Sequence, residues 1–142
     1  MRPVLKIKKL DPRAKLPAYA HEGDAALDLF CLEQVTIKPG ERAKIRTGVA
    51  LEFPSNYVAL VWDKSGVANN SGLKTLGGVI DSSYRGELLV GLHNLSQDTY
   101  TFESGHKVAQ LLIQPIVSAQ VEEVSELSDT TRGEGGFGST GK

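Results

Sequence analysis

The sequence has little cysteine and no long apolar run. Cys31 is the only cysteine among 142 residues, so the chain can form no internal disulfide, which suits a reducing compartment. No apolar run approaches the roughly 18 residues that a membrane-spanning helix needs. The basic first ten residues also lack the apolar segment of a signal peptide. We therefore expect a soluble, cytoplasmic protein that does not bind membranes.

An excess of charge of one sign is also missing. The chain carries 16 basic and 17 acidic residues, a net charge of −1. Proteins that bind nucleic acid through broad electrostatic attraction carry a clear positive excess or a basic face. The balance argues against a nucleic-acid partner, although it leaves room for a local basic pocket.

Glycine, in contrast, is plentiful, and it separates short apolar runs. Short runs with alternating or β-branched residues predict strands. Periodicity alone would also allow a helix near the C-terminal end of the set, but Pro115 favours a strand there. At most one short helix fits, around residues 65–70. The expected strands cover residues 4–8, 35–38, 43–53, 57–62, 87–94, 108–117 and 120–124.

Several short strands separated by turn residues are typical of an all-β jelly roll or β-sandwich. After Leu127 the composition changes to Ser, Asp, Thr, Gly and Glu, with Phe137 the one large apolar residue. Such a segment cannot bury a core and is expected to be mobile. We therefore divide the chain into a jelly-roll domain, residues 1–127, and a flexible Gly-rich tail, residues 128–142.

The tail contains two misleading nucleotide-binding patterns. Residues 136–141 satisfy G-x-G-x-x-G, and residues 136–142 satisfy the first part of a Walker A loop. Both loops must lead directly into a helix, and a Walker A loop needs Ser or Thr after its Lys. The sequence, whose last residue is Lys142, offers neither.

The tail nevertheless has the composition of a phosphate-binding flap. Glycines let backbone N–H groups approach phosphate oxygens, and Ser139 and Thr140 add hydroxyl donors. Arg132 can bind a phosphate bidentately, and Phe137 offers a flat face to a base. Composition alone favours the alternative of a disordered, solvated tail.

Residues 77–87 form a turn-rich segment between two expected strands. In one interpretation it is a hairpin in which Asp81 makes turn hydrogen bonds. In the other, Asp81 is a carboxylate on a rigid hairpin beside Tyr84, where it orients and deprotonates a water molecule. General-base catalysis of that kind contributes roughly 10²–10⁴-fold to a rate.

Three further positions have both a structural and a functional interpretation. Ser65 lies at an expected turn or helix start, where it either caps the helix or binds an anion. Asp28 lies between apolar neighbours and needs a partner, which is a turn or a metal-bound water. Gln110, in an apolar run, either faces solvent or binds phosphate. The histidines have no metal-ligand spacing.

The order of these segments is more specific than any one of them. Residues 25–29, 63–68, 77–87, 105–112 and 132–141 resemble, in this order, the five motifs of the homotrimeric dUTP pyrophosphatase family. The third and fifth matches are the most specific, and the resemblance covers nearly the whole chain.

The resemblance implies a jelly-roll homotrimer with active sites at the subunit interfaces. It implies Mg²⁺-assisted hydrolysis of dUTP to dUMP and pyrophosphate, which limits uracil incorporation into DNA and supplies dUMP for dTMP synthesis. Asp81 would orient the water that attacks the α-phosphorus, Tyr84 would pack under the deoxyribose, and Asp28 would lie near the metal through its water shell. The substrate contacts that it implies are Lys64, Ser65, Gly66, Gly78, Val79, Ile80, Tyr84, Glu87, Gln110, Arg132, Phe137, Gly138, Ser139 and Thr140.

The chain departs from the family pattern at two places. Lys64 stands where the second motif usually has Arg, which keeps the charge but loses the planar fork. His106 and Lys107 replace a common Asp-Arg pair in the fourth motif, so a local salt bridge there is in doubt.

Two other functions compete with dUTP hydrolysis. The related dCTP deaminases need a Glu on the strand after the hairpin, and Gly91 occupies that position, so no general acid–base is available there. A non-catalytic regulatory module of the same fold is the second rival. The presence of Asp81, Arg132 and Phe137 argues against it.

Overall fold

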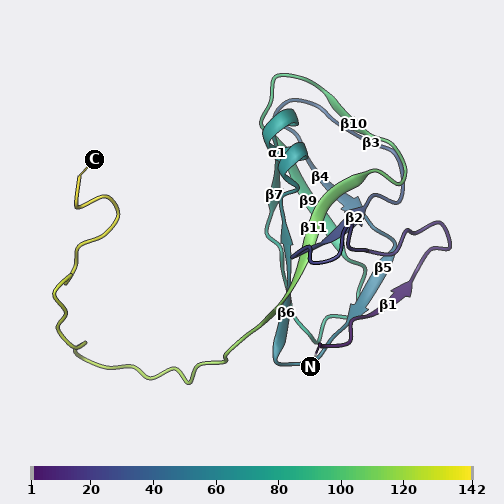
Figure 1. The fold of residues 1–142 in the computed structure, drawn as a ribbon. Helices are drawn as coiled ribbons and strands as arrows, with labels where there is room; N and C mark the ends of the chain where they lie inside the picture. Colours follow the sequence, from purple (N-terminus) through teal and green to yellow (C-terminus); the bar gives the residue numbers. More distant parts are fainter. Residues whose placement is uncertain (1, 142) are drawn as a thin grey trace.

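Antiparallel pairing joins every pair of neighbouring strands in the computed structural model, which describes residues 2–141. A four-stranded sheet has the order β2-β11-β6-β8, and a three-stranded sheet has the order β4-β9-β7. Two strand pairs, β1-β5 and β10-β3, complete the fold (Figure 1). The elements are β1 Lys6–Lys9, β2 Leu27–Phe30, β3 Val35–Ile37, β4 Arg42–Arg46, β5 Val49–Glu52, β6 Tyr57–Trp62, α1 Ser65–Ser71, β7 Leu73–Leu76, β8 Val79–Ile80, β9 Leu89–Asn94, β10 Tyr100–Phe102 and β11 Lys107–Pro115.

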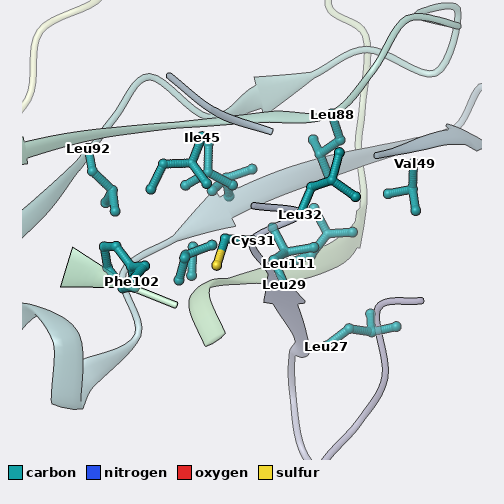
Figure 2. Packing of buried hydrophobic residues seen from close by; sticks show 14 of the residues in the cluster. Leu27, Leu29, Cys31, Leu32, Ile45, Val49, Leu88, Leu92, Phe102 and Leu111 are labelled. Atoms are coloured by element: carbon teal, nitrogen blue, oxygen red, sulfur yellow. The ribbon is translucent and has the colours of Figure 1, made fainter. Parts of the chain in front are cut away.

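One apolar core holds the sheets together. Alternate residues of β2 and β11, such as Leu29 and Leu111, point to the same interior as Ile45 and Leu92 of the three-stranded sheet (Figure 2). Val90 of that sheet belongs to the same core. All five are fully buried, and each large side chain of this kind contributes roughly 1.5–3 kcal/mol when removed from water. The expected all-β jelly-roll class is confirmed.

The expected strand 43–53 is interrupted in its middle. β4 ends at Arg46 and β5 begins at Val49. Gly48, between them, has φ +72°, and a Cβ there would lie 2.9 Å from the Cβ of Ala14. The Thr47 hydroxyl donates to the carbonyl of Leu88 at 2.6 Å. The break follows from the close approach of Gly48 to Ala14, which no local pattern in the sequence signals.

The expected strand 120–124 is wrong. Within residues 2–141 the last strand is β11, and residues 118–134 are all exposed without strand structure. Figure 1 shows this part of the chain leaving the sheets after β11 and running away from them. A strand needs a partner for its backbone groups, and the tail meets none in its own chain. The boundary at 127/128 between domain and flap stays a prediction.

The long strand β11 gives the molecule two distinct ends. Its beginning, at Lys107, lies near the end of β6 and the start of α1, whereas Pro115 pairs with Tyr57 at the start of β6. Pro115 has no N–H to donate, which suits a strand end. The tail therefore leaves from the end opposite to α1 (Figure 1). In the described part of the chain, no helix is long and apolar enough to cross a bilayer.

Candidate active site

The Asp81 turn directly follows the short strand β8. The Tyr84 N–H donates to the Asp81 carbonyl at 3.1 Å, and the Tyr84 hydroxyl donates to the Glu87 carbonyl at 2.8 Å. Gly86 permits this arrangement, because a Cβ there would lie 2.5 Å from the Tyr84 hydroxyl oxygen. Two hydrogen bonds and one close approach thus fix the turn, and the carboxylate of Asp81 is left exposed at its tip.

Two arginines reinforce the same hairpin. The Arg85 guanidinium donates to the carbonyls of Ser82 and Tyr84, at 2.6 and 3.2 Å. Arg46 of β4 binds both carboxylate oxygens of Glu87 at 3.1 to 3.2 Å. Glu87, expected to contact substrate, therefore has its side chain engaged in an ion pair. Neither arginine was singled out from the sequence, because Arg46 reaches Glu87 from a distant strand and Arg85 binds backbone carbonyls, which no residue pattern marks.

The hairpin forms one wall of a shallow depression. Its volume is about 280 Å³, and Asp81 lies at its rim together with the half-exposed ring of Tyr84. Gly78, at φ +121°, lies tightly against β6, since a Cβ there would be 2.6 Å from the Val61 carbonyl oxygen. The residues that line the depression are Val79, Ile80, Asp81, Tyr84, Glu87 and Leu89.

Asp28, on β2, is the buried centre of an ion-pair cluster. Its Oδ1 atom lies 2.8 Å from Lys64 Nζ, and its Oδ2 atom lies 2.9 Å from Lys107 Nζ. Burial alone would raise the pKa of Asp28, but the two ammonium groups outweigh it and hold this pKa below its ordinary value. Lys107, whose pairing was in doubt from the sequence, thus forms a salt bridge with another motif.

The pKa of Asp28 leads to a pH-dependent prediction. A lowered folded-state pKa means that the stabilisation is fully present above the ordinary aspartate pKa of about 3.9, and is lost as the pH falls through the lower folded value. We expect Asp28→Asn to reduce the free energy of unfolding at pH 7 by roughly 2–3 kcal/mol. This is less than for a fully buried pair because both lysines are partly exposed.

Urea unfolding of the wild type and Asp28→Asn at pH 7 and pH 3 checks this. The difference between them should shrink at the lower pH. An equal difference at both pH values would contradict the ion-pair assignment.

The second and fourth motifs meet beside this cluster. Lys64 is the N-cap residue of α1, and Ser65 and Gly66 are its first two residues, so Ser65 is not an ordinary N-cap. Gln110, on β11, pairs with both Asp28 and Trp62 in the register of the sheet. Its amide donates to the Asp63 carbonyl at 2.7 Å. The motifs are thus brought together at the α1 end of the molecule.

One chain does not bring the Asp81 turn and the α1 start together. β8 pairs Ile80 with Ala59 and then leads to Asp81, near the beginning of β6. Lys64 and Ser65 follow Trp62, at the other end of β6. A strand rises roughly 3.3 Å per residue, so the two groups lie roughly 13 Å or more apart.

The tail residues lie apart from both groups. Arg132 donates from Nε to the Gly135 carbonyl at 2.6 Å, and Phe137 is fully exposed at φ +50°. Gly138, Ser139 and Thr140 follow in an exposed turn. Figure 1 shows this end of the chain away from the sheets. Within its own chain the flap therefore covers no site in this conformation.

Mg²⁺ would find no complete set of protein ligands here. Among residues 2–141, no group of three or more His, Cys, Asp or Glu side chains is placed to hold a metal ion. Mg²⁺ usually keeps several waters and binds through one or two carboxylates together with substrate phosphates.

Comparisons with known proteins identify the family of the chain. The family model described as dUTPase matches residues 12–141. The deoxyuridine 5'-triphosphate nucleotidohydrolase of Clostridium kluyveri is 49% identical over 139 residues, covering 96% of this chain and 97% of its own. The dUTPase of Staphylococcus bacteriophage 80alpha, solved with dUPNHPP, superposes with a TM-score of 0.92 at 32% identity, over 98% and 99% of the two chains.

A third relative bears on the metal. A mutant of the dUTPase from phage phi11 of S. aureus, whose structure describes the coordination of a structural Mg(II) ion, superposes with a TM-score of 0.83 at 30% identity. The match covers 89% of this chain and 99% of that one. Together with the match over residues 12–141, these relatives establish that the chain belongs to the dUTPase family.

Proposed function

We propose that the chain hydrolyses dUTP to dUMP and pyrophosphate through a water molecule that Asp81 orients and deprotonates for attack on the α-phosphorus. The observation that carries this mechanism is the exposed Asp81 carboxylate on a turn held by Tyr84 and Arg85, at the rim of a nucleoside-sized depression. In the cytoplasm, this reaction would limit uracil incorporation into DNA and supply dUMP for dTMP synthesis.

The nucleoside and the triphosphate would contact different parts of the site. The backbone of Gly78, Val79 and Ile80 would read the uracil edge, and the Tyr84 ring would pack under the deoxyribose, leaving no room for a 2′-hydroxyl. The phosphates would be bound by Lys64, Ser65, Gly66 and Gln110. Mg²⁺ would neutralise the triphosphate, with Asp28 next to its water shell. Phosphoryl transfer needs mainly positioning and charge neutralisation, which these groups supply.

A homotrimer would complete the site. The Asp81 turn and the Lys64–Ser65 segment lie at opposite ends of β6. We therefore propose that one nucleotide contacts the Asp81 turn of one subunit and the Lys64–Ser65 segment of another. The outer face of the four-stranded sheet suits such an interface, since most of its apolar side chains, Trp62 and Val79 above all, are not fully covered in the single chain. We call this the outer face; the pairing register places on it Val58, Leu60, Trp62, Val79 and Leu112.

The outer face gives a prediction about assembly. Trp62 and Val79 are 53% and 71% exposed, and covering one large apolar side chain contributes roughly 1.5–3 kcal/mol. We expect Trp62→Lys to dissociate the trimer at concentrations where the wild type stays assembled. Size-exclusion chromatography with light scattering measures this. Leu95→Lys, at an exposed leucine outside the outer face, is the matched control. A fully trimeric Trp62→Lys variant would rule this interface out.

The tail would act as a flap over the completed site. Arg132, Ser139 and Thr140 would bind the terminal phosphates, Gly138 would let the backbone approach them, and Phe137 would lie over the uracil. A fully extended chain from residue 129 onward reaches up to roughly 45 Å. This reach is long enough for the flap to close over the site of a neighbouring subunit.

Deamination of dCTP is less well supported. Gly91 lies on β9 opposite Leu76, and a Cβ there would be 3.1 Å from the Leu76 carbonyl oxygen. A glutamate at this position would therefore push against its neighbour as well as being absent from the sequence. Pyrophosphate release from dUTP, dTTP, dCTP and UTP, with and without Mg²⁺, tests the proposed reaction. Release confined to dUTP is expected; ammonia release from dCTP would overturn it.

A further inference from the structure

Asp63 connects the end of β6 to the edge of the three-stranded sheet. Its Oδ1 atom accepts the backbone N–H of Thr75 at 2.7 Å, and its Oδ2 atom accepts the Lys74 ammonium. In the order β4-β9-β7 the strand β7 is an edge, so an N–H that faces away from β9 has no strand partner there. The Asp63 carboxylate takes the place of that partner.

The main chain of Asp63 is held from the other sheet. Its carbonyl oxygen accepts the side-chain amide of Gln110, on β11, at 2.7 Å. One residue is thus tied through its side chain to β7 and through its backbone to β11. These two strands belong to different sheets, so Asp63 joins the sheets at the end of the molecule where α1 begins.

Within the segment that these contacts enclose, Lys64 is tied to Asp28 and Leu73 is buried in the core, but the helix between them is weakly anchored. Asp63 and Thr75 close a loop that contains α1, and this helix has no buried residue and no side-chain N-cap hydrogen bond. Val67 alone among its apolar side chains packs partly against the core. The position of the first helical turn therefore depends strongly on how the ends of the loop are held.

We propose that Asp63 is a positioning residue, which holds the Lys64–Gly66 segment in place to bind the triphosphate of the substrate. This inference rests on the proposed phosphate contacts of that segment. Because Lys74 neutralises Asp63, Lys64 is left to pair with Asp28. Asp63 is thus matched by Lys74, and Asp28 by Lys64 and Lys107.

The ionisation of Asp63 agrees with this role. Burial would raise its pKa, but the hydrogen bonds from Lys74 and Thr75 outweigh burial and hold the pKa below its ordinary value. The carboxylate therefore stays charged well below neutral pH, and its contacts are lost only when the pH falls through the lowered value. Near neutral pH, both contacts of the Asp63 carboxylate, with Lys74 and with Thr75, are therefore present.

The test separates triphosphate binding from nucleoside binding. We measure Kd for dUPNHPP and for dUMP, with Mg²⁺, in Asp63→Ala and Asp63→Asn. Loss of a charge-assisted hydrogen bond corresponds to about a tenfold weakening. In Asp63→Ala, we expect the Kd for dUPNHPP and the KM for dUTP to rise by about tenfold or more. The Kd for dUMP should change by less than about twofold. Asp63→Asn keeps an acceptor for Thr75 and should recover part of the loss.

Equal weakening of both ligands in Asp63→Ala, or a fall in melting temperature with no change in either Kd, would overturn the proposal. If Asp63→Ala does not fold, Asp63→Asn and Lys74→Met decide, since both remove the ion pair between residues 63 and 74 and keep an acceptor for the Thr75 N–H. Each should raise the Kd for dUPNHPP more than the Kd for dUMP, and unchanged Kd values in both variants would overturn the proposal. Ser65→Ala distinguishes a failure of the positioning role of Asp63 from a failure of the phosphate-binding role proposed for the segment. If Ser65→Ala weakens dUPNHPP binding and the Asp63 variants do not, positioning by Asp63 is wrong. If Ser65→Ala has no effect, the phosphate role of the segment is itself wrong, and the positioning role with it.

Discussion

Replacing Asp81 with Asn is expected to lower the rate of pyrophosphate release from dUTP by roughly 10²–10⁴-fold, the usual contribution of a general base. Asparagine keeps the size of the side chain but cannot take a proton from water. The turn should persist in the variant, because its hydrogen bonds come from Tyr84 and Arg85 and not from the Asp81 carboxylate. Nucleotide affinity should therefore change little.

The measurement is steady-state pyrophosphate release, paired with a Kd for dUPNHPP. Asp98→Asn, at another exposed aspartate, controls for the loss of one negative charge on the surface. Turnover of Asp81→Asn close to that of Asp98→Asn would contradict the mechanism. A rise in Kd without a fall in kcat would instead make Asp81 a binding residue.

Truncation after Thr131 should leave the fold intact and remove most of the activity. The tail lies outside the apolar core and is exposed, so little stability depends on it. Arg132 and Phe137 together represent roughly 2.5–6 kcal/mol of phosphate and base contact. At about 1.4 kcal/mol per tenfold, kcat/KM should fall by a factor of about 10² to 10⁴.

Thermal unfolding should give nearly the same melting temperature for the truncated and full-length chains. Arg132→Ala and Phe137→Ala, measured singly, should each account for part of the loss in kcat/KM. Wild-type activity in the truncated chain would refute the flap. A large fall in melting temperature would show that the tail is part of the fold and not a mobile cover.

The long strands and two short ones, β1 and β3, were predictable from the sequence, whereas the short strands β2, β7, β8 and β10 were not. β6, β9 and β11 carry enough apolar or β-branched residues to be recognised by pattern. β8 has only two residues, Val79–Ile80, and exists because it pairs with β6. The break at Gly48 arises from a close approach to Ala14, and the failure of residues 120–124 to form a strand arises from the lack of a partner. Each of these is decided by tertiary contacts.

The candidate site shows the same division. Asp81 and Tyr84 could be singled out because the roles proposed for them depend on a short segment with a recognisable order. The ion-pair cluster of Asp28, Lys64 and Lys107 comes from residues far apart in the chain, and only the fold brings them together. Asp63 stood in a recognised motif but carried no signal, since its partners lie on β7 and β11.

Trp62 also makes the molecule its own optical reporter. It is the only tryptophan in the chain, and it lies half exposed on the outer face between the Asp81 turn and the start of α1. In the proposed trimer, a neighbouring subunit would cover the indole and shift its emission to shorter wavelength, and nucleotide in the proposed site would change the emission again. Assembly and substrate binding can therefore be followed in the unmodified protein, on the same sample and without an attached dye.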